Sequence, residues 1–428
     1  MKIRDSRRRA TLCLGSALAA VAVIAGSVAA PSFAAPPPST PTTPFTTPNT
    51  DSCPQKTRPP APIDESEVPA PGEPTPTAPP IPTPPVGGGQ LGQCGVVLPK
   101  GAPPVPPDIS ATAWQLSDLD TGEVLAAKDP HGRYRPASTI KVLLATVALR
   151  TLDLNKVVIG TEDDANADGT RVGIGPGGRY TNHQLMQGLI MTSGNDAAHA
   201  IATQLGGETA TVAKMNELAK SLGALDTHAA SPSGLDGPGM STSAYDLSVL
   251  FREAMTIPVF AELIHTQQVD FPGYPANPKI QDDKDHPGFP IANDNHLLYD
   301  YDGAIGGKTG YTDDARQTFV AAAERDGRRL AITLLKADVL PLRPANQAAR
   351  LLDYGFALPR GTSVGRLPDP DRKQPKTGAA LASPPPKDQE SQPPHEEGHG
   401  DNRTVWIVGG VILVLALLLG ARRMSRRR

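Results

Sequence analysis

The chain has little cysteine and no internal repeats apart from a low-complexity Pro/Thr bias. Only three cysteines occur in 428 residues, and no set of Cys and His has the spacing of zinc ligands. Cys13 lies in an N-terminal apolar run, which leaves Cys53 and Cys94 as a pair that could form a disulfide outside the cell. The scattered histidines are more typical of surface or core positions than of a metal site; they are His131, His183, His199 and His228.

The central part of the chain also lacks an excess of basic residues. The net charge of the whole chain is −3, but residues 1–34 carry +4 and residues 422–428 carry +5, so the part between them carries −12. A nucleic-acid-binding surface needs the opposite balance, which argues against that class of protein. Basic ends on an acidic body instead suggest a protein that contacts a membrane.

The N-terminal stretch 1–34 is typical of a secretory signal peptide. A basic stretch with five Lys and Arg side chains precedes an alanine-rich apolar run from Ala10 to Ala30. Ser32 and Ala34 then supply the small residues that a signal peptidase recognises. We expect cleavage near Ala34; the alternative is an uncleaved N-terminal anchor.

A second apolar run lies near the C-terminus. Val405–Ala421 contains no charged residue, and five arginines follow it at positions 422–428. A run of this length is at the lower limit for crossing a bilayer, and flanking arginines tend to stay in the cytoplasm. We expect a single-pass protein of the cell membrane with a cytoplasmic tail and an extracytoplasmic body; a buried core helix is the alternative.

Proline marks two regions that we expect to be disordered. Of the 47 prolines, 25 lie between Pro31 and Pro107, where apolar periodicity is missing and backbone donors are few. Residues 35–107 are therefore predicted to be a linker, and residues 359–404 a tether to the membrane helix. One globular domain remains, at residues 108–358.

This domain shows strand patterns at its ends and helix patterns between them. Short runs on both sides of Asp120-Thr121-Gly122 predict one hairpin, and runs around Asp326-Gly327 predict a second. Thr181 and Gln184 have the spacing of a capping box before an apolar helical run. The order predicts an α+β fold: an antiparallel sheet flanked by helices, with a mostly helical insertion.

The motif Ser138-Thr139-Ile140-Lys141 can carry nucleophilic chemistry. At a spacing of i and i+3 on a helix, the two polar side chains share a face. A serine hydroxyl needs a base, and a lysine can be that base when burial or a nearby cation lowers its pKa. The alternative is a helix start with a surface lysine; against it, Lys141 interrupts an apolar run.

Two further motifs lie downstream. Ser193-Gly194-Asn195 offers a hydroxyl and an amide, and it would be an ordinary loop if it stood alone. Lys308-Thr309-Gly310 can hold a substrate carboxylate and let a substrate strand approach the backbone. A second copy, Lys376-Thr377-Gly378, lies in the Pro-rich tether and is taken as a chance match.

In this order, the three motifs resemble the signature of penicillin-recognising serine enzymes. They begin at Ser138, Ser193 and Lys308, all within the one predicted domain. The stretch NDNHLLYDYDGAIGGKTGYT at residues 293–312, and the stretches at 231–235 and 241–246, are similar to D-alanyl-D-alanine carboxypeptidases. The resemblance covers nearly all of residues 110–356, and the chain resembles the membrane-anchored, low-molecular-mass penicillin-binding proteins of actinobacteria.

The resemblance implies a role for each residue. Ser138 would be the nucleophile and Lys141 its base, while Ser193 and Asn195 would complete the proton relay and contact the substrate. The expected substrate is a peptidoglycan stem peptide ending in D-Ala-D-Ala, and β-lactams are the expected inhibitors; no metal or cofactor is implied. The carboxylate site would consist of Lys308, Thr309, Gly310, Tyr311 and Arg343, although Arg343 could equally be a surface residue at a helix start. Backbone N–H groups of Ser138 and Tyr311 would form the oxyanion hole.

Other activities share these motifs. A class A β-lactamase needs a deacylating glutamate in an E-x-x-L-N pattern, which does not occur between Asn195 and Lys308. A transpeptidase or D,D-endopeptidase uses the same acylation step, and a catalytically silent wall-binding protein would be expected to lose one of the motif residues. Two features depart from the family: Gly307 replaces a commonly apolar residue, and we expect a disordered tether where some relatives carry a second, all-β domain.

Overall fold

The computed structural model describes residues 45–370 of the chain. The predicted signal peptide at 1–34, the predicted membrane helix at 405–421 and most of the predicted tether lie outside this range. None of the helices within residues 45–370 has the length and apolar character needed to cross a membrane.

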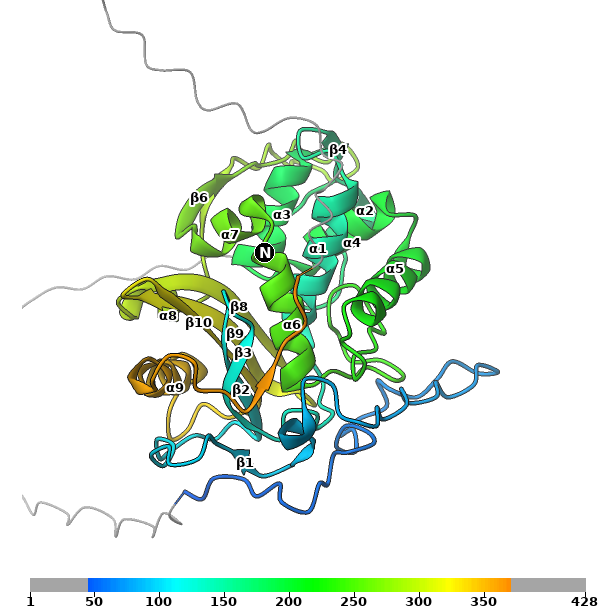
Figure 1. The fold of residues 1–428 in the computed structure, drawn as a ribbon. Helices are drawn as coiled ribbons and strands as arrows, with labels where there is room; N and C mark the ends of the chain where they lie inside the picture. Colours follow the sequence, from blue (N-terminus) through cyan, green and yellow to red (C-terminus); the bar gives the residue numbers. More distant parts are fainter. Residues whose placement is uncertain (1–44, 371–428) are drawn as a thin grey trace, which may run out of the picture. The chain divides into compact units, whose positions relative to one another are not determined.

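One antiparallel sheet forms the centre of the fold (Figure 1). The strand order is β1-β3-β2-β10-β9-β8, and β11 pairs with β3 as well. Strands from both ends of the sequence meet at its centre, where Leu330 of β10 pairs with Asp118 of β2. The strands are β1 (Val96–Val97), β2 (Ala113–Asp118), β3 (Glu123–Lys128), β8 (Ala304–Thr312), β9 (Arg316–Arg325), β10 (Arg328–Ala337) and β11 (Gly365–Arg366).

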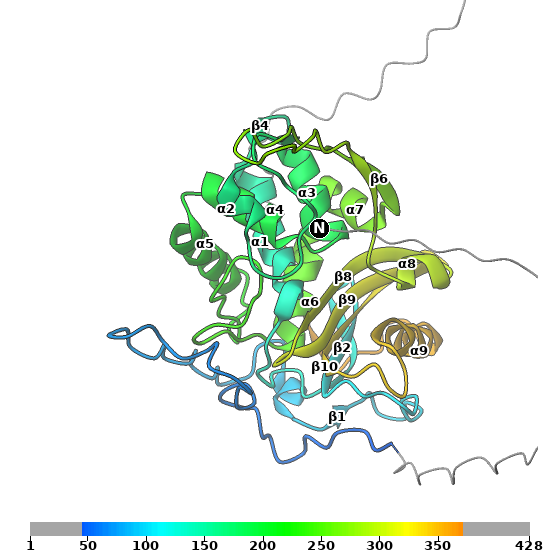
Figure 2. The same ribbon diagram turned by 180° about the vertical axis from the view of Figure 1, so that it is seen from behind.

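Helices cover both faces of this sheet. Successive side chains of a strand point to opposite faces, and the central strands carry apolar side chains on both. On β10, Leu330 and Ile332 join the core under α8 (Leu297–Asp300) and α9 (Pro344–Ala357). Ala331 and Leu335 join the core on the opposite face, under the helical insertion. Figure 2 shows α9 on one side of the sheet and α6 on the other. The predicted α+β class is confirmed by this arrangement.

The insertion between β3 and β8 is mostly helical, as predicted. Its third helix begins with the expected capping box: the Thr181 hydroxyl accepts from the Gln184 N–H, and the Gln184 side chain accepts from the Thr181 N–H. The small strand pairs are β4 (Val157–Ile159) with β5 (Arg179–Thr181) and β6 (Gln268–Phe271) with β7 (Phe289–Ala292). The helices are η2 (Ala137–Ile140), α1 (Lys141–Thr151), α2 (Glu162–Ala165), α3 (Asn182–Met191), α4 (Asn195–Gln204), α5 (Glu208–Ser221), α6 (Ala244–Ala254) and α7 (Pro258–His265).

The prediction of a disordered linker is wrong for the part of it that the structure describes. Residues 47–107, which we call the N-terminal segment, run below the sheet, and one loop of the segment projects outward past α5 (Figures 1 and 2). The segment includes the short helix η1 (Gly89–Gly92) and strand β1, and it is closed by a disulfide between Cys53 and Cys94 with a Cα–Cα distance of 5.2 Å. Its proline content prevents a core of its own, but Leu91 and Val97 join the core of the domain.

The predicted tether likewise begins later than expected. Residues 359–370 remain part of the domain, because β11 pairs with β3 and the Arg366 N–H donates to the Gly87 carbonyl. The folded unit therefore extends beyond the predicted range of 108–358 at both ends.

Candidate active site

The turn that carries Ser138 is fixed from two sides. Ser138 lies in η2, directly before α1, and Ala137 before it has a φ of 47°. The Pro136 carbonyl accepts hydrogen bonds from the hydroxyl of Thr139, at 2.6 Å, and from the hydroxyl of Thr318 on β9, at 2.7 Å. The backbone of the turn is thereby attached to the sheet. These contacts hold Ala137 in its left-handed conformation, which would otherwise be unfavourable for a residue with a side chain.

Lys141 is the first residue of α1, and its spacing from Ser138 brings the two side chains into contact. Its Nζ lies 2.8 Å from Ser138 Oγ, 2.7 Å from Asn195 Oδ1 and 2.6 Å from the Ser233 carbonyl oxygen. An amide oxygen and a carbonyl oxygen can only accept. A neutral Lys141 amine would donate its two protons to these two groups and direct its lone pair toward the Ser138 hydroxyl.

The surroundings of Lys141 favour that neutral form. The side chain is 0% exposed, and burial is the largest cause that lowers its pKa well below the ordinary value. The positive charge of Lys308 lowers the pKa further, whereas the charge of Asp196 raises it. A buried lysine whose pKa is lowered is available in the neutral form that accepts a proton, which is the property that a general base needs.

Ser193 and Asn195 lie at the junction of α3 and α4. Asn195 is the first residue of α4, and its Nδ2 donates to the Asp168 carbonyl at 2.6 Å while its Oδ1 accepts from Lys141. Ser193 is 8% exposed and has a φ of 62°. Within residues 45–370, the structure gives the Ser193 hydroxyl no hydrogen-bond partner, so its role in a proton relay stays a prediction.

Strand β8 places the third motif against the nucleophile turn. A Cβ atom at Gly310 would lie 2.9 Å from the Ser138 backbone nitrogen and closer still to Thr318 Oγ1, so only glycine fits. Lys308, on the same face, is 1% exposed. Burial lowers the pKa of Lys308 to about 8, although the charge of Asp294 opposes the shift.

Thr309 and Arg343 line one cavity, of about 550 Å³. Asp294 and His296, from the loop before α8, lie on its wall. Arg343 directly precedes α9 and thus comes to this cavity from a distant part of the sequence. Tyr311 is 48% exposed, and its hydroxyl donates to Asp313. Ser138, Lys141 and Lys308 do not line this cavity, so a role for Arg343 in the carboxylate site stays a prediction.

Sequence reasoning missed three groups at the site. The Asp196 carboxylate is 0% exposed and accepts from the N–H groups of residues 172, 173, 174 and 197. The Ser233 carbonyl holds Lys141, and Asp294 acts on Lys308. An Asp directly after the Ser-Gly-Asn motif was the only local signal for Asp196; a backbone carbonyl gives no signal at all.

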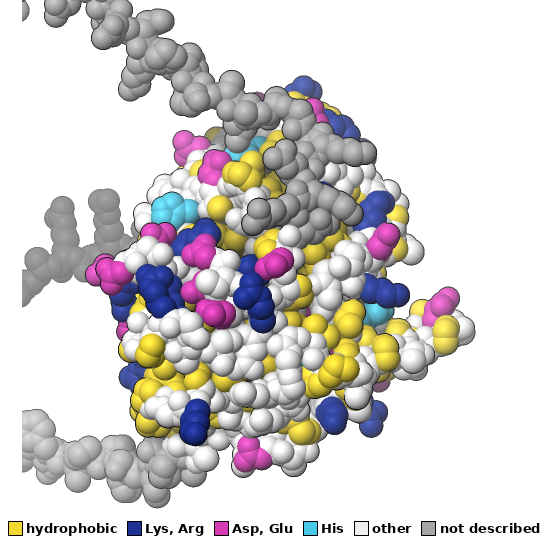
Figure 3. Space-filling view, viewed as in Figure 1, with side chains coloured by type: hydrophobic (Ala, Val, Ile, Leu, Met, Phe, Trp, Pro, Cys, Tyr) yellow, Lys and Arg dark blue, Asp and Glu magenta, His cyan; other side chains and the backbone are white. Residues whose placement is uncertain are grey.

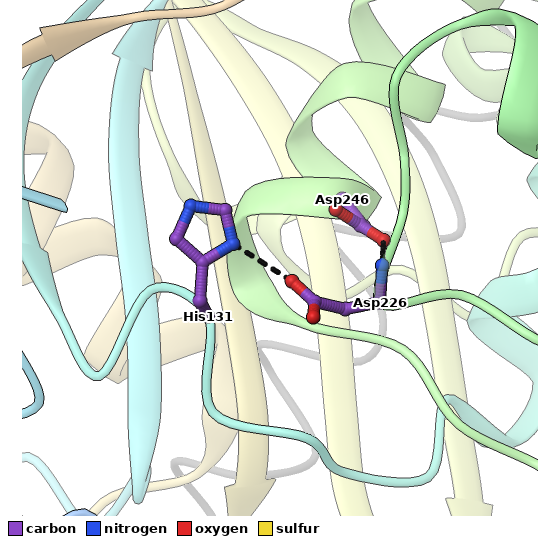
Figure 4. Close-up of side chains that lie close together, drawn as sticks. All are labelled: His131, Asp226 and Asp246. Carbon is purple, nitrogen blue, oxygen red and sulfur yellow. Dashed lines mark hydrogen bonds and ion pairs between the residues drawn. The ribbon is translucent and has the colours of Figure 1, made fainter. Parts of the chain in front are cut away.

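A second cluster of titratable groups lies outside the site (Figure 4). His131 Nδ1 lies 2.7 Å from Asp226, and its Nε2 lies 3.0 Å from the Val86 carbonyl. Burial by itself lowers the pKa of His131, but the hydrogen bond and the charge of Asp226 outweigh it and raise the net value. Both ring nitrogens face acceptors and the Asp226 N–H donates to Asp246, so His131, Asp226 and Asp246 form a hydrogen-bonded network.

The arrangement around Ser138 suits covalent catalysis. A nucleophile contacts a buried base, β8 packs against its turn at Gly310, and the charge of Lys308 acts on the base. Residues 100–339 match the sequence profile of the peptidase S11 family, described as D-alanyl-D-alanine carboxypeptidase. The chain belongs to this family. It is a serine-type D-alanyl-D-alanine carboxypeptidase, as the similar proteins also indicate.

Relatives and solved structures agree on this family. The D-alanyl-D-alanine carboxypeptidase DacB2 of Mycobacterium tuberculosis is 50% identical over 275 residues, covering 63% of this chain and 90% of the relative. The DacD enzyme of Salmonella typhimurium is 35% identical, and the match covers 59% of this chain but 64% of that protein. The crystal structure of the D-alanyl-D-alanine carboxypeptidase from M. tuberculosis has a TM-score of 0.59 at 49% identity, covering 63% of this chain and all of that one. The Streptomyces K15 DD-transpeptidase has a TM-score of 0.54 at 28% identity, covering 60% of this chain and 99% of that one.

Proposed function

We propose that this carboxypeptidase removes the terminal D-alanine from peptidoglycan stem peptides through an acyl enzyme on Ser138. The Ser138 oxygen attacks the carbonyl carbon of the penultimate D-alanine while Lys141 takes the hydroxyl proton. The peptide C–N bond then breaks, and the leaving amine receives a proton. Water hydrolyses the resulting ester and regenerates the serine. The observation that carries this proposal is the contact of 2.8 Å between Lys141 Nζ and Ser138 Oγ, beside two groups that can only accept.

The substrate is proposed to lie along β8. Lys308, Thr309 and Arg343 would hold its terminal carboxylate. The two cations would balance its negative charge, and together with the hydroxyl they would donate hydrogen bonds that fix its orientation. The backbone N–H groups of Ser138 and Tyr311 would hold the developing oxyanion. Gly310 supports this arrangement, since any side chain there would separate β8 from the Ser138 turn.

We also propose that the enzyme acts outside the cytoplasm, on the cell wall, and that Val405–Ala421 anchors it in the membrane. This rests on the sequence: the uncharged apolar run and the arginines that follow it, which tend to stay in the cytoplasm. Removal of the terminal D-alanine would limit crosslinking of the wall. β-Lactams would acylate Ser138 and inhibit the enzyme.

The test compares the full chain with its Ser138→Ala variant. Each is incubated with a pentapeptide ending in D-Ala-D-Ala and then with a fluorescent penicillin. D-alanine release and a stable covalent label, both lost in the variant, are expected. A label that turns over within seconds would favour a β-lactamase, and the absence of both signals in the unchanged enzyme would favour a silent wall-binding protein.

A further inference from the structure

The residues that lead from the sheet into the nucleophile turn carry an unusual set of buried cations. Between the end of β3 and Ser138 lie Lys128, His131, Arg133 and Arg135. Lys128 is 3% exposed, Arg133 1% and Arg135 2%. A buried cation is costly unless it is paired or hydrogen-bonded. These groups therefore need partners, and the partners help to fix the path of the backbone between β3 and Ser138.

Each of these four basic side chains contacts the N-terminal segment. Lys128 donates to the Pro48 carbonyl, and His131 donates to the Val86 carbonyl. Arg133 donates to the carbonyls of Thr57, at 2.9 Å, and Pro80, at 3.2 Å. The guanidinium of Arg135 forms a bidentate pair with the Glu67 carboxylate, in which Nη2 and Oε2 are 2.8 Å apart.

The proline content of the segment explains why its carbonyls are available. Proline has no N–H group, and extended proline-rich chain forms no internal ladder of hydrogen bonds. Its carbonyl oxygens therefore remain free to accept from arginine and lysine. In the space-filling view, the lower part of the molecule, where Figure 1 places this segment, shows mainly hydrophobic and uncharged atoms with few charged side chains (Figure 3).

The disulfide encloses most of these acceptors. Thr57, Glu67, Pro80 and Val86 all lie between Cys53 and Cys94, which are 41 positions apart in the sequence. A crosslink of this kind limits how far the enclosed loop can move away from the domain. The Arg133 backbone N–H adds another attachment, to the Gln55 carbonyl at 2.9 Å.

From these contacts we infer that the N-terminal segment positions the nucleophile, with Glu67 as the positioning residue and Arg135 as the group through which it acts. Arg135 adjoins Pro136, whose carbonyl anchors the Ser138 turn to Thr318 of β9. When Glu67 pairs with Arg135, this short connection keeps Ser138 within reach of Lys141. Misplacement of a reacting group by about 1 Å can lower a rate about 100-fold. The inference rests on the proposed role of Ser138.

The first experiment measures acylation of the full chain by a fluorescent penicillin and separates the binding constant from the acylation rate constant. Glu67→Gln is expected to lower the rate constant about 10-fold to 100-fold and to leave the binding constant almost unchanged. Glu67→Asp retains the carboxylate and should recover most of the rate. Asp118→Asn is the matched control, because Asp118 pairs with buried Arg328 away from the turn; it should lower the melting temperature and leave the rate constant unchanged.

The second experiment uses the disulfide. Reduction should slow acylation of the unchanged enzyme and have no further effect on the variant with Cys53→Ser and Cys94→Ser. The inference is overturned if Glu67→Gln acylates at the unchanged rate, or if Asp118→Asn slows acylation equally at equal stability. Failure of the unchanged enzyme to become labelled at all would instead contradict the role of Ser138.

Discussion

The active site and the N-terminal segment use buried cations in opposite ways. Lys141 is surrounded by neutral acceptors and by a second cation, Lys308, so its pKa is lowered and it can serve as a base. Arg135 is equally buried but faces the Glu67 carboxylate, which raises its pKa against the effect of burial. Lys141 is thus poised to accept a proton, whereas the charged partner of Arg135 holds that cation as a structural attachment.

The largest effect expected from this comparison is that of Lys141→Met. A methionine fits the apolar run of α1 but cannot take the Ser138 proton, so acylation should fall by at least about 10³-fold. The acylation rate with a fluorescent penicillin measures this, and a thermal melt shows whether the variant is folded. Acylation at more than a tenth of the original rate would show that Lys141 is not the base.

The disulfide of the N-terminal segment provides the next test. Its loop spans 41 positions, and the chain-entropy account of such a crosslink gives a loss of about 4 kcal/mol in the free energy of unfolding when both cysteines become serine. Urea unfolding of the oxidised enzyme and of the double variant measures the difference. A loss below about 1 kcal/mol is well under the usual range for a native disulfide. It would mean that the segment contributes little to the free energy of unfolding, and that its contacts with Arg135 and its neighbours are not structural attachments.

These two regions also differ in how far the sequence predicted them. Ser138 and Lys141 are three positions apart, so helix geometry alone brings them together. Lys308 and Gly310 are two positions apart, so strand geometry alone places them on one face of β8. The N-terminal segment has no such pattern. Its composition correctly predicted the lack of a core of its own, but its order depends on single contacts with distant residues, such as Glu67 with Arg135 and Leu91 with the domain core.

Asp196 and Arg343 illustrate the same limit within the site. The carboxylate of Asp196 accepts from the backbone N–H groups of Val172 and Ile174, in a distant loop, as well as from that of its neighbour. Backbone donors are present at almost every position, so no residue type indicates where they will meet. Arg343, directly before α9, lines the same cavity as Thr309 of β8 although it lies far from it in the sequence. Local spacing predicts contacts within one element; contacts between elements require the fold.

Close packing between β8 and the Ser138 turn can be tested at Gly310. Gly310→Ala would place a Cβ atom 2.9 Å from the Ser138 backbone nitrogen, and we expect acylation to slow about 10-fold to 100-fold. Gly327→Ala is the control, because its φ is +65° and no atom lies within 4 Å of the added carbon. It should cost stability through backbone strain and leave acylation unchanged. Equal acylation by both variants would contradict a tight contact at Gly310.

The smallest effect expected is a change in pH dependence at Lys308. Its pKa is about 8, so above that pH the lysine loses the charge that binds a substrate carboxylate, and KM should rise. The Asp294 carboxylate raises this pKa, so Asp294→Asn should move the rise in KM to lower pH, by up to about one pH unit. Asp300→Asn changes another carboxylate on the same cavity and should leave the profile in place. If the two variants give the same profile, the charge of Asp294 does not act on Lys308. If only Asp294→Asn shifts the profile, a carboxylate raises the pKa of Lys308, as Glu67 raises that of Arg135. The effect on Lys308 is smaller, so that Lys308 still loses its proton in the accessible pH range.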